Sequence, residues 1–419
     1  MTDDKPKPSL AKIILIGLIG NVMEWYDFAV YGYFATIIGK LFFPASDPAV
    51  SLIASFGAFA AGFLVRPLGG LVLGRIGDLV GRQRAMTLSV MAMAVPTVSM
   101  ALLPTYATAG IAAPILLIAL RIVQGLSVGG EFTSSLIYLA EHAPPHRRAL
   151  TAIWGNWGAT AGILLGSGVG LLVSTLLSDD QLLRWGWRVP FAIGGLVAIT
   201  GWLIRSSVHA DVSVGQSQSP VKEVFTRYRG DVLRVALLNI GSGVAFYTAF
   251  VYAVSYIRTI DRLSESIALE LNTLAMVVLL VVLPVAAWLS DRHGRKRLLV
   301  VAHILLLLGA VPLFQLIHSG NDIQILIGEI LFALIVGAAT AGMVALNVEL
   351  MPAPIRCTGL AFAYNASMGL FGGTTPLMAA WLIDSTGDPI APAYWVAATA
   401  ALSLITLLFW TSETRDVEL

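Results

Sequence analysis

The chain alternates between long apolar runs and short polar segments. A helix needs about 20 apolar residues to cross the hydrocarbon core of a bilayer, and runs of that size recur along almost the whole sequence. The pattern therefore predicts twelve membrane-spanning helices. In chain order they are 13–39, 49–74, 84–104, 112–140, 149–177, 187–205, 234–258, 267–290, 297–318, 323–349, 357–383 and 391–411.

The longest polar stretch between these runs, residues 206–233, separates six predicted spans from six. We interpret it as a cytoplasmic linker between two bundles, residues 1–205 and 234–419. The predicted fold class is an all-α membrane protein with twelve transmembrane helices in two six-helix bundles.

The basic residues predict the orientation in the membrane. Of the 26 Lys and Arg residues, 19 lie in segments on the side of the N-terminus, five lie on the other side, and Arg66 and Arg121 lie within spans. Because cytoplasmic loops carry the excess of Lys and Arg, both termini are predicted to be cytoplasmic.

The composition agrees with a chain that is solvated mainly by lipid. Hydrophobic residues make up 57% of it, charged residues 12%, and the mean hydropathy is +0.81, whereas soluble domains carry about 25% charged residues. A net charge of +1 excludes a broad nucleic-acid-binding surface. The single Cys357 permits no disulfide, and the sequence offers no metal cluster, nucleophile–base set or phosphate-binding Gly-rich loop. We expect no enzyme activity, no cofactor and no nucleic-acid partner.

Two charged motifs recur at half the length of the chain. Asp78, in a Gly-containing basic segment, has its counterpart in Asp291, 213 positions further on, and Glu141-x-x-Pro-x-x-x-Arg148 returns as Glu349-x-x-Pro-x-x-x-Arg356 at an offset of 208. Both motifs fall at the predicted cytoplasmic ends of spans. Related halves around a central cavity are typical of carriers that work by alternating access.

We predict that these motifs form a cytoplasmic gate, in which salt bridges join the halves when the cavity opens outward. The alternative is plain anchoring by basic residues, which needs no acids at fixed spacing. The predicted gate residues are Asp78, Arg82, Arg84, Glu141, Arg148, Asp291, Arg295, Glu349 and Arg356.

Charged residues also occur inside the predicted spans of the first half. They are Glu24, Asp27, Arg66, Arg121 and Glu131. A charge at mid-bilayer costs at least about 2.5–3.5 kcal/mol, so these side chains must face one another or water, and they predict a polar cavity.

We assign Arg66 or Arg121 to a substrate carboxylate, because a guanidinium offers a fork of donors. Glu24, Asp27 or Glu131 would carry a coupling proton, since buried carboxyls can hold one near neutral pH. A static salt-bridge network is the alternative. Further predicted substrate contacts are Tyr31, Gln124, Asn239, Tyr364 and Asn365.

Several motifs resemble known transporters. The Asp78 segment is similar to a loop of the major facilitator superfamily. Asn21-x-x-Glu-Trp-Tyr-Asp-Phe-x-x-Tyr31, Arg66-Pro-Leu-Gly-Gly70, Gln124-Gly-Leu-Ser-Val-Gly-Gly-Glu131 and Trp185-Gly-Trp-Arg-Val-Pro190 resemble its metabolite–proton symporter family. The resemblance implies a twelve-span carrier of a bacterial inner membrane that imports small organic acids, or zwitterions such as proline and betaine, with protons.

The branch within that family is predicted from two features. Phe371-Gly-Gly-Thr-Thr-Pro376 resembles a segment of citrate carriers, and only about eight residues follow the last span, without the coiled-coil extension of the proline/betaine branch. We therefore expect a small organic anion as substrate, imported with protons by a monomer in the lipid bilayer. The alternatives are a zwitterionic solute such as proline or betaine, sodium coupling, an uncoupled uniporter, or a sensor.

Overall fold

The computed structural model describes residues 9–46, 48–144, 146–206 and 219–419. Over these residues the chain is helical and forms no strand, as predicted. Eleven helices are long and apolar enough to cross a membrane, or twelve if the bent pair Asp179–Gly186 and Arg188–Gly201 is one span.

The first half contains six spans and short helices between them. The elements are α1 Leu10–Tyr33, α2 Ala35–Phe42, α3 Pro48–Leu64, α4 Arg66–Val80, α5 Arg82–Leu102, α6 Tyr106–Ala109, α7 Ala112–Glu141, α8 Arg148–Leu176, α9 Asp179–Gln181, the π-helix η1 Leu182–Gly186 and α10 Arg188–Ser206.

The second half repeats this arrangement after a short helix, α11 Pro220–Phe225. Its elements are α12 Arg229–Tyr247, the π-helix η2 Thr248–Tyr252, α13 Ala253–Thr259, α14 Glu265–His293, α15 Arg295–Ile317, α16 Asp322–Leu350, the 3-10 helix η3 Ala353–Ile355, α17 Arg356–Ser367, the π-helix η4 Met368–Gly372, α18 Thr375–Thr386 and α19 Ala391–Trp410.

Four predicted spans are interrupted in the structure. The first breaks at Phe34, between α1 and α2. The second breaks at Val65, before Pro67 in the first turn of α4, where proline is tolerated because its missing N–H has no partner in a helix start. The seventh and eleventh contain the π-helices η2 and η4. Hydropathy could not predict these breaks, because the apolar run continues through them.

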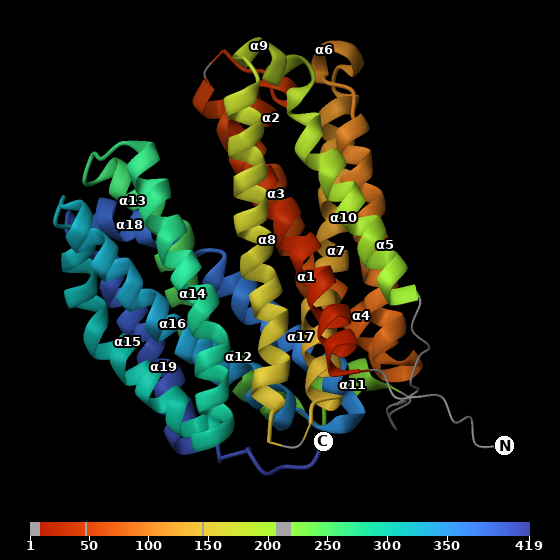
Figure 1. Ribbon diagram of the computed structural model, residues 1–419, viewed down its shortest axis with the longest axis vertical. Helices are drawn as coiled ribbons and strands as arrows, with labels where there is room; N and C mark the ends of the chain where they lie inside the picture. Colours follow the sequence, from red (N-terminus) through yellow and green to blue (C-terminus); the bar gives the residue numbers. More distant parts are fainter. Residues whose placement is uncertain (1–8, 47, 145, 207–218) are drawn as a thin grey trace.

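The two halves form two bundles that lie side by side (Figure 1). The bundles meet at the end where α1 begins and where the chain terminates, and they diverge toward the opposite end. We call the first the gate end. The predicted linker, 206–233, also lies there in part: its α11 contacts α17 and α4, while residues 207–218 fall outside the described part of the chain.

Small residues bring α1 and α8 into close contact. A Cβ at Gly162 would lie 2.4 Å from the carbonyl oxygen of Val22, and one at Gly158 would lie 2.8 Å from that of Leu18. A Gly face lets helix backbones approach this closely. These glycines of α8 thus form a packing surface for α1.

Candidate functional site

Asp78 joins the two bundles at the gate end. The side chain is fully buried at the end of α4, and its carboxylate accepts hydrogen bonds from the backbone N–H groups of Cys357 and Thr358, both at 2.9 Å. The hydroxyl of Thr358 donates to the same carboxylate at 2.7 Å. These groups form the first turn of α17, where unpaired N–H groups and the helix dipole favour a negative charge.

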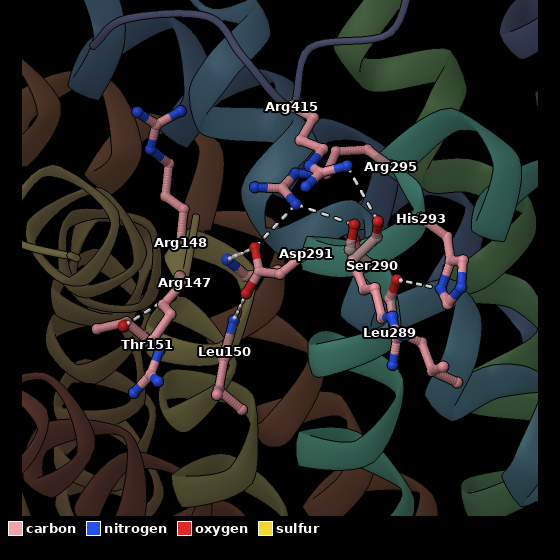
Figure 2. A network of polar contacts seen from close by, with 12 residues as sticks. Arg147, Arg148, Leu150, Thr151, Leu289, Ser290, Asp291, His293, Arg295 and Arg415 are labelled. Atoms are coloured by element: carbon pink, nitrogen blue, oxygen red, sulfur yellow. Dashed lines mark hydrogen bonds and ion pairs between the residues drawn. The ribbon is translucent and has the colours of Figure 1, made fainter. Parts of the chain in front are cut away.

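Asp291 makes the matching connection in the opposite direction (Figure 2). Its carboxylate accepts from the backbone N–H groups of Ala149 and Leu150, at 3.0 and 2.8 Å, in the first turn of α8. Arg295 pairs with it at 2.8 Å. Each half of the protein therefore supplies one carboxylate to a helix start in the other half.

Glu141 lies between two arginines. Arg82 of the same bundle approaches it at 3.2 Å, and Arg356 of the other bundle at 2.9 Å. The guanidinium of Arg82 also donates to the carbonyl oxygen of Gly77 at 2.9 Å. This three-residue chain crosses the bundle boundary.

Glu349 has the equivalent position in the second half. Arg295 donates to it at 3.1 Å, and Arg148 of the first bundle donates at 3.0 Å. The hydroxyl of Thr414, from the segment after α19, donates at 2.6 Å. Sequence reasoning missed this segment, because a polar tail after the last span carries no signal of its own.

Arg84 lies apart from this network. Its side chain is exposed, and no hydrogen bond or ion pair connects it with the gate residues in the described ranges. It follows Arg82 by two positions on α5, and residues two apart on a helix point to different faces. The other eight predicted gate residues are brought together.

A cavity lies between the bundles above the gate. It encloses about 930 Å³ of space, open mouth included, within the range of small-molecule sites. Helices of both halves contribute to its wall, and the lining residues used below are Glu24, Trp25, Arg66, Phe132, Asn239, Phe246, Tyr247, Asn347, Tyr364 and Asn365.

Arg66 enters this cavity from the first turn of α4. Its guanidinium carbon lies 3.9 Å from the ring centroid of Phe63 and 4.5 Å from that of Phe28, and its side chain is 5% exposed. The Nε and Nη2 atoms are buried without a hydrogen-bond partner. The aromatic rings thus hold a cation whose donors stay available.

Glu24 lines the same cavity from α1 and is also buried. Beside it the wall is aromatic: the rings of Phe132 and Tyr364, from opposite bundles, stack with centroids 4.9 Å apart. Trp25, Phe246 and Tyr247 complete this surface.

The amides of the second half lie on the cavity wall. Asn239 and Asn347 donate to each other's carbonyl oxygen at 2.9 and 3.1 Å. Asn365 donates to the carbonyl oxygen of Gly129 across the bundle boundary at 2.7 Å. The predicted contacts Asn239, Tyr364 and Asn365 are therefore all at the cavity.

Asp27 and Arg121 form an ion pair within the first bundle, outside the cavity lining. Nη1 of Arg121 lies 2.9 Å from Asp27, and Gln124 and Thr97 donate to the same carboxylate, each at 3.2 Å. The guanidinium of Arg121 also lies 3.9 Å from the ring centroid of Tyr31.

Five predicted site residues therefore lie behind the cavity rather than on it: Asp27, Tyr31, Arg121, Gln124 and Glu131. Tyr31, Arg121 and Gln124 belong to the Asp27 cluster, where the hydroxyl of Tyr31 donates to the carbonyl oxygen of Ser55 at 3.0 Å. Glu131 is buried on α7 and does not line the cavity. The sequence predicted which helices carry polar residues toward the bundle interior. It could not predict which of those residues line the cavity and which are packed behind it.

The aromatic partners of Arg66 were not predicted as site residues. Phe28 belongs to the motif between Asn21 and Tyr31, whereas Phe63 is an ordinary apolar residue of the second predicted span. Pairing them with Arg66 requires the angle between α1, α3 and α4.

Comparisons with known proteins agree with this architecture. Residues 13–209 match the family model "Sugar (and other) transporter", and residues 235–419 match "Major Facilitator Superfamily". The chain is 38% identical to a proline/betaine transporter of Salmonella typhimurium over 95% of its own length and 82% of that protein. It is 36% identical to the inner membrane metabolite transport protein YhjE of Escherichia coli, over 99% and 97%.

Among solved structures, the proton:xylose symporter XylE superposes with a TM-score of 0.79, covering 97% of this chain and 96% of that one, at 18% identity. The fold and the two-bundle cavity define a secondary transporter. This chain belongs to the major facilitator superfamily and, as its motifs predicted, to the metabolite–proton symporter family within it. It is a transporter and not an enzyme.

The predicted localisation, multi-pass in a bacterial inner membrane, is confirmed by these bacterial relatives together with the eleven or twelve spanning helices. The predicted organic-acid substrate is not supported by the comparisons. The relatives named after a substrate support the alternative, a zwitterionic solute.

Proposed function

We propose that this protein imports a small zwitterionic solute of the proline or betaine type together with protons. It would do so as a monomer, because one chain supplies both bundles and the whole cavity. The names of its relatives support this substrate class, and the charges of the cavity support it independently.

The main structural support for a zwitterionic substrate is the number and sign of the charges on the cavity wall. Arg66 is its single cationic residue and Glu24 its single acidic residue among the described lining residues. A zwitterion carries one charge of each sign and matches this pair. A di- or tricarboxylate would need further cations, and Arg121, the nearest candidate, is paired with Asp27.

Arg66 is the proposed carboxylate receptor. A guanidinium offers two parallel donors to a carboxylate, and Nε and Nη2 are the two atoms left without partners. Because Phe28 and Phe63 pack against the guanidinium, little side-chain freedom is lost on binding.

The cationic end of the solute is proposed to face Glu24 and the aromatic wall. Ring faces attract ammonium groups, including fully methylated ones that cannot donate hydrogen bonds. Trp25, Phe132 and Tyr364 provide such faces. This arrangement would accept both a secondary amine and a quaternary ammonium.

The coupling proton is proposed to bind at Asp27 or Glu24. Protonation of Asp27 would weaken its ion pair with Arg121, and Gln124 and Thr97 would then lose a charged acceptor. Glu24 would instead lose its attraction for the solute cation. Either change would couple occupancy of the cavity to the proton gradient.

In this proposal the gate end is cytoplasmic, as the basic residues predict, and the conformation is outward-facing. Import requires the Asp78 and Asp291 contacts to break so that the bundles part at the gate end.

Substrate-induced proton uptake by proteoliposomes tests the proposal. Proline, betaine, citrate, tricarballylate, α-ketoglutarate and shikimate would be added outside vesicles that report pH. We expect external alkalinisation with proline or betaine and none with the carboxylic acids. A response to citrate or α-ketoglutarate would restore the organic-acid assignment. Silence with all six, together with thermal stabilisation by betaine, would indicate sodium coupling, a uniporter or a sensor.

A further inference from the structure

A second cavity lies at the gate end, between the bundles and beside Asp291. Figure 2 shows four of its lining residues, Arg147, Leu150, Asp291 and Arg415. It encloses about 780 Å³ of space, open mouth included. The first bundle contributes His146, Arg147 and Leu150, and the second contributes Trp288, Asp291, Arg292 and Arg415.

The lining of this cavity has an excess of positive charge. Its one carboxylate, Asp291, is already engaged by Arg295 and by the first turn of α8. The guanidinium groups of Arg147 and Arg292 make no hydrogen bond or ion pair with any side chain in the described ranges. Arg415 donates to the carbonyl oxygen of Arg292 at 3.0 Å, and its Nε is buried without a partner.

An apolar surface adjoins these three arginines. Trp288 lies in the penultimate turn of α14 and is 46% exposed, and the guanidinium of Arg292 lies 5.5 Å from its ring centroid. α14 ends at His293, so this tryptophan lies where its span leaves the membrane. Tryptophan at that depth is typical of the boundary between acyl chains and headgroups.

We propose that this cavity binds the headgroup of an anionic phospholipid. Guanidinium groups pair with phosphate oxygens through parallel donors, and basic pockets between helices at the cytoplasmic surface suit anionic headgroups. Arg147, Arg292 and Arg415 take the phosphate, and Trp288 and Leu150 contact the glycerol and the start of the acyl chains.

The site contains residues of both bundles, so its occupancy depends on the conformation. Arg147 and Arg292 line the same cavity because Asp291 holds the start of α8. When the gate opens, the two halves of the site separate. A bound anionic lipid therefore stabilises the closed gate, and it does so whichever solute the protein carries.

Calorimetric titration of the full-length protein with dioctanoyl-phosphatidylglycerol tests the site. Each basic residue near a membrane surface contributes about a fivefold factor to anionic-lipid binding, so the double variant Arg147→Gln/Arg292→Gln should bind about 30-fold more weakly. Arg229→Gln/Arg297→Gln removes the same charge from exposed positions outside the cavity and should bind like the wild type. Equal weakening in both double variants would show a general charge effect and overturn the site.

Two further arms identify the ligand and its effect. Inorganic phosphate that binds as tightly as the lipid would overturn the lipid assignment in favour of a free anion.

Spin labels at Arg84→Cys and Arg297→Cys, in a Cys357→Ser background, report the width of the gate in nanodiscs. Phosphatidylglycerol should raise the closed fraction several-fold over phosphatidylcholine, and an unchanged distance distribution would overturn the proposed coupling. This distance measurement on the wild-type lining decides the outcome even if the double variant fails to fold.

Discussion

Asp78 and Asp291 make the same contact from opposite bundles. Each ends a span and accepts two backbone N–H groups from the first turn of a helix in the other half. The donors to Asp78 are Cys357 and Thr358, and the donors to Asp291 are Ala149 and Leu150. These two pairs of donors are themselves related by the offset of 208. The gate is therefore a two-fold repeated latch.

Asp78→Asn should shift the protein toward the state in which the gate end is open. An amide oxygen can replace only one of the carboxylate oxygens, and a hydrogen bond to a charged group contributes about 1.5–3 kcal/mol. The ratio of open to closed molecules should rise at least about tenfold, as measured by spin-label distances across the gate end. Thr358→Val, which removes only the hydroxyl donor, should cause a smaller shift in the same direction.

Arg66→Gln should weaken solute binding by about 100-fold or more, because two charge-assisted hydrogen bonds to the solute carboxylate are lost. The affinity of Arg66→Lys should lie between that of the wild type and that of Arg66→Gln. Lysine keeps the positive charge but loses the forked donors and the stacking on Phe28 and Phe63. Equilibrium binding of labelled betaine measures both. Wild-type affinity in Arg66→Gln would remove this residue from the site, and Arg75→Gln, which changes an exposed arginine of the same helix, is the control.

Neutralising the coupling carboxyl should abolish uphill uptake and leave exchange intact. Glu24→Gln, Asp27→Asn and Glu131→Gln would be compared in accumulation and counterflow assays. We expect loss of accumulation with retained counterflow in Asp27→Asn or Glu24→Gln. If Glu24→Gln still responds to external acid, the proton binds at Asp27 or Glu131.

The Asp261–His318 pair should make stability depend on pH. Nδ1 of His318 lies 2.8 Å from Asp261, beyond the ends of α13 and α15. Burial raises the pKa of Asp261 above its ordinary value of 3.8, although His318 opposes the shift. The folded state therefore favours the protonated carboxyl more than the unfolded state does, and this contribution is lost as pH rises from about 3.8 through the folded-state pKa.

The thermal midpoints of the wild type and Asp261→Asn, recorded in detergent from pH 4 upward, check this sign. The wild type should lose stability relative to Asp261→Asn as pH rises. Parallel curves for the two proteins would contradict it.

Two glycines of α8 should respond oppositely to alanine. At Gly162 the new Cβ would meet the carbonyl oxygen of Val22 at 2.4 Å, whereas nothing lies within 4 Å at Gly168. Gly162→Ala should lower the thermal midpoint because α1 must move away. Gly168→Ala should raise it slightly, since alanine favours a helix over glycine by about 1 kcal/mol. A lower midpoint in both would show that backbone flexibility, not contact, limits these positions.

The spans and the contacts among the proposed gate residues could be predicted because their signals are local or repeated. Apolar runs set the helices, and the offset between Glu141 and Glu349 exposed the duplication before any contact was known. The cavity was harder to predict. Arg66 and Arg121 look alike in sequence, as arginines within spans, and only packing shows that one faces the cavity while Asp27 neutralises the other. The expectation of an organic-acid substrate rested on segments near the end of the chain, which do not line the cavity, whereas the named relatives favour the zwitterionic alternative.

The latch of Asp78 and Asp291 recognises main chain rather than side chains. The hydrogen bonds themselves require only a backbone N–H group from Ala149, Leu150 and Cys357, and tight packing limits the size of the buried Ala149 and Cys357 side chains. The backbone contacts therefore require both carboxylates but no particular side chain at the helix starts that donate to them. This difference explains why the two halves share the acids, Asp78 and Asp291, but carry different residues at the helix starts that donate to them.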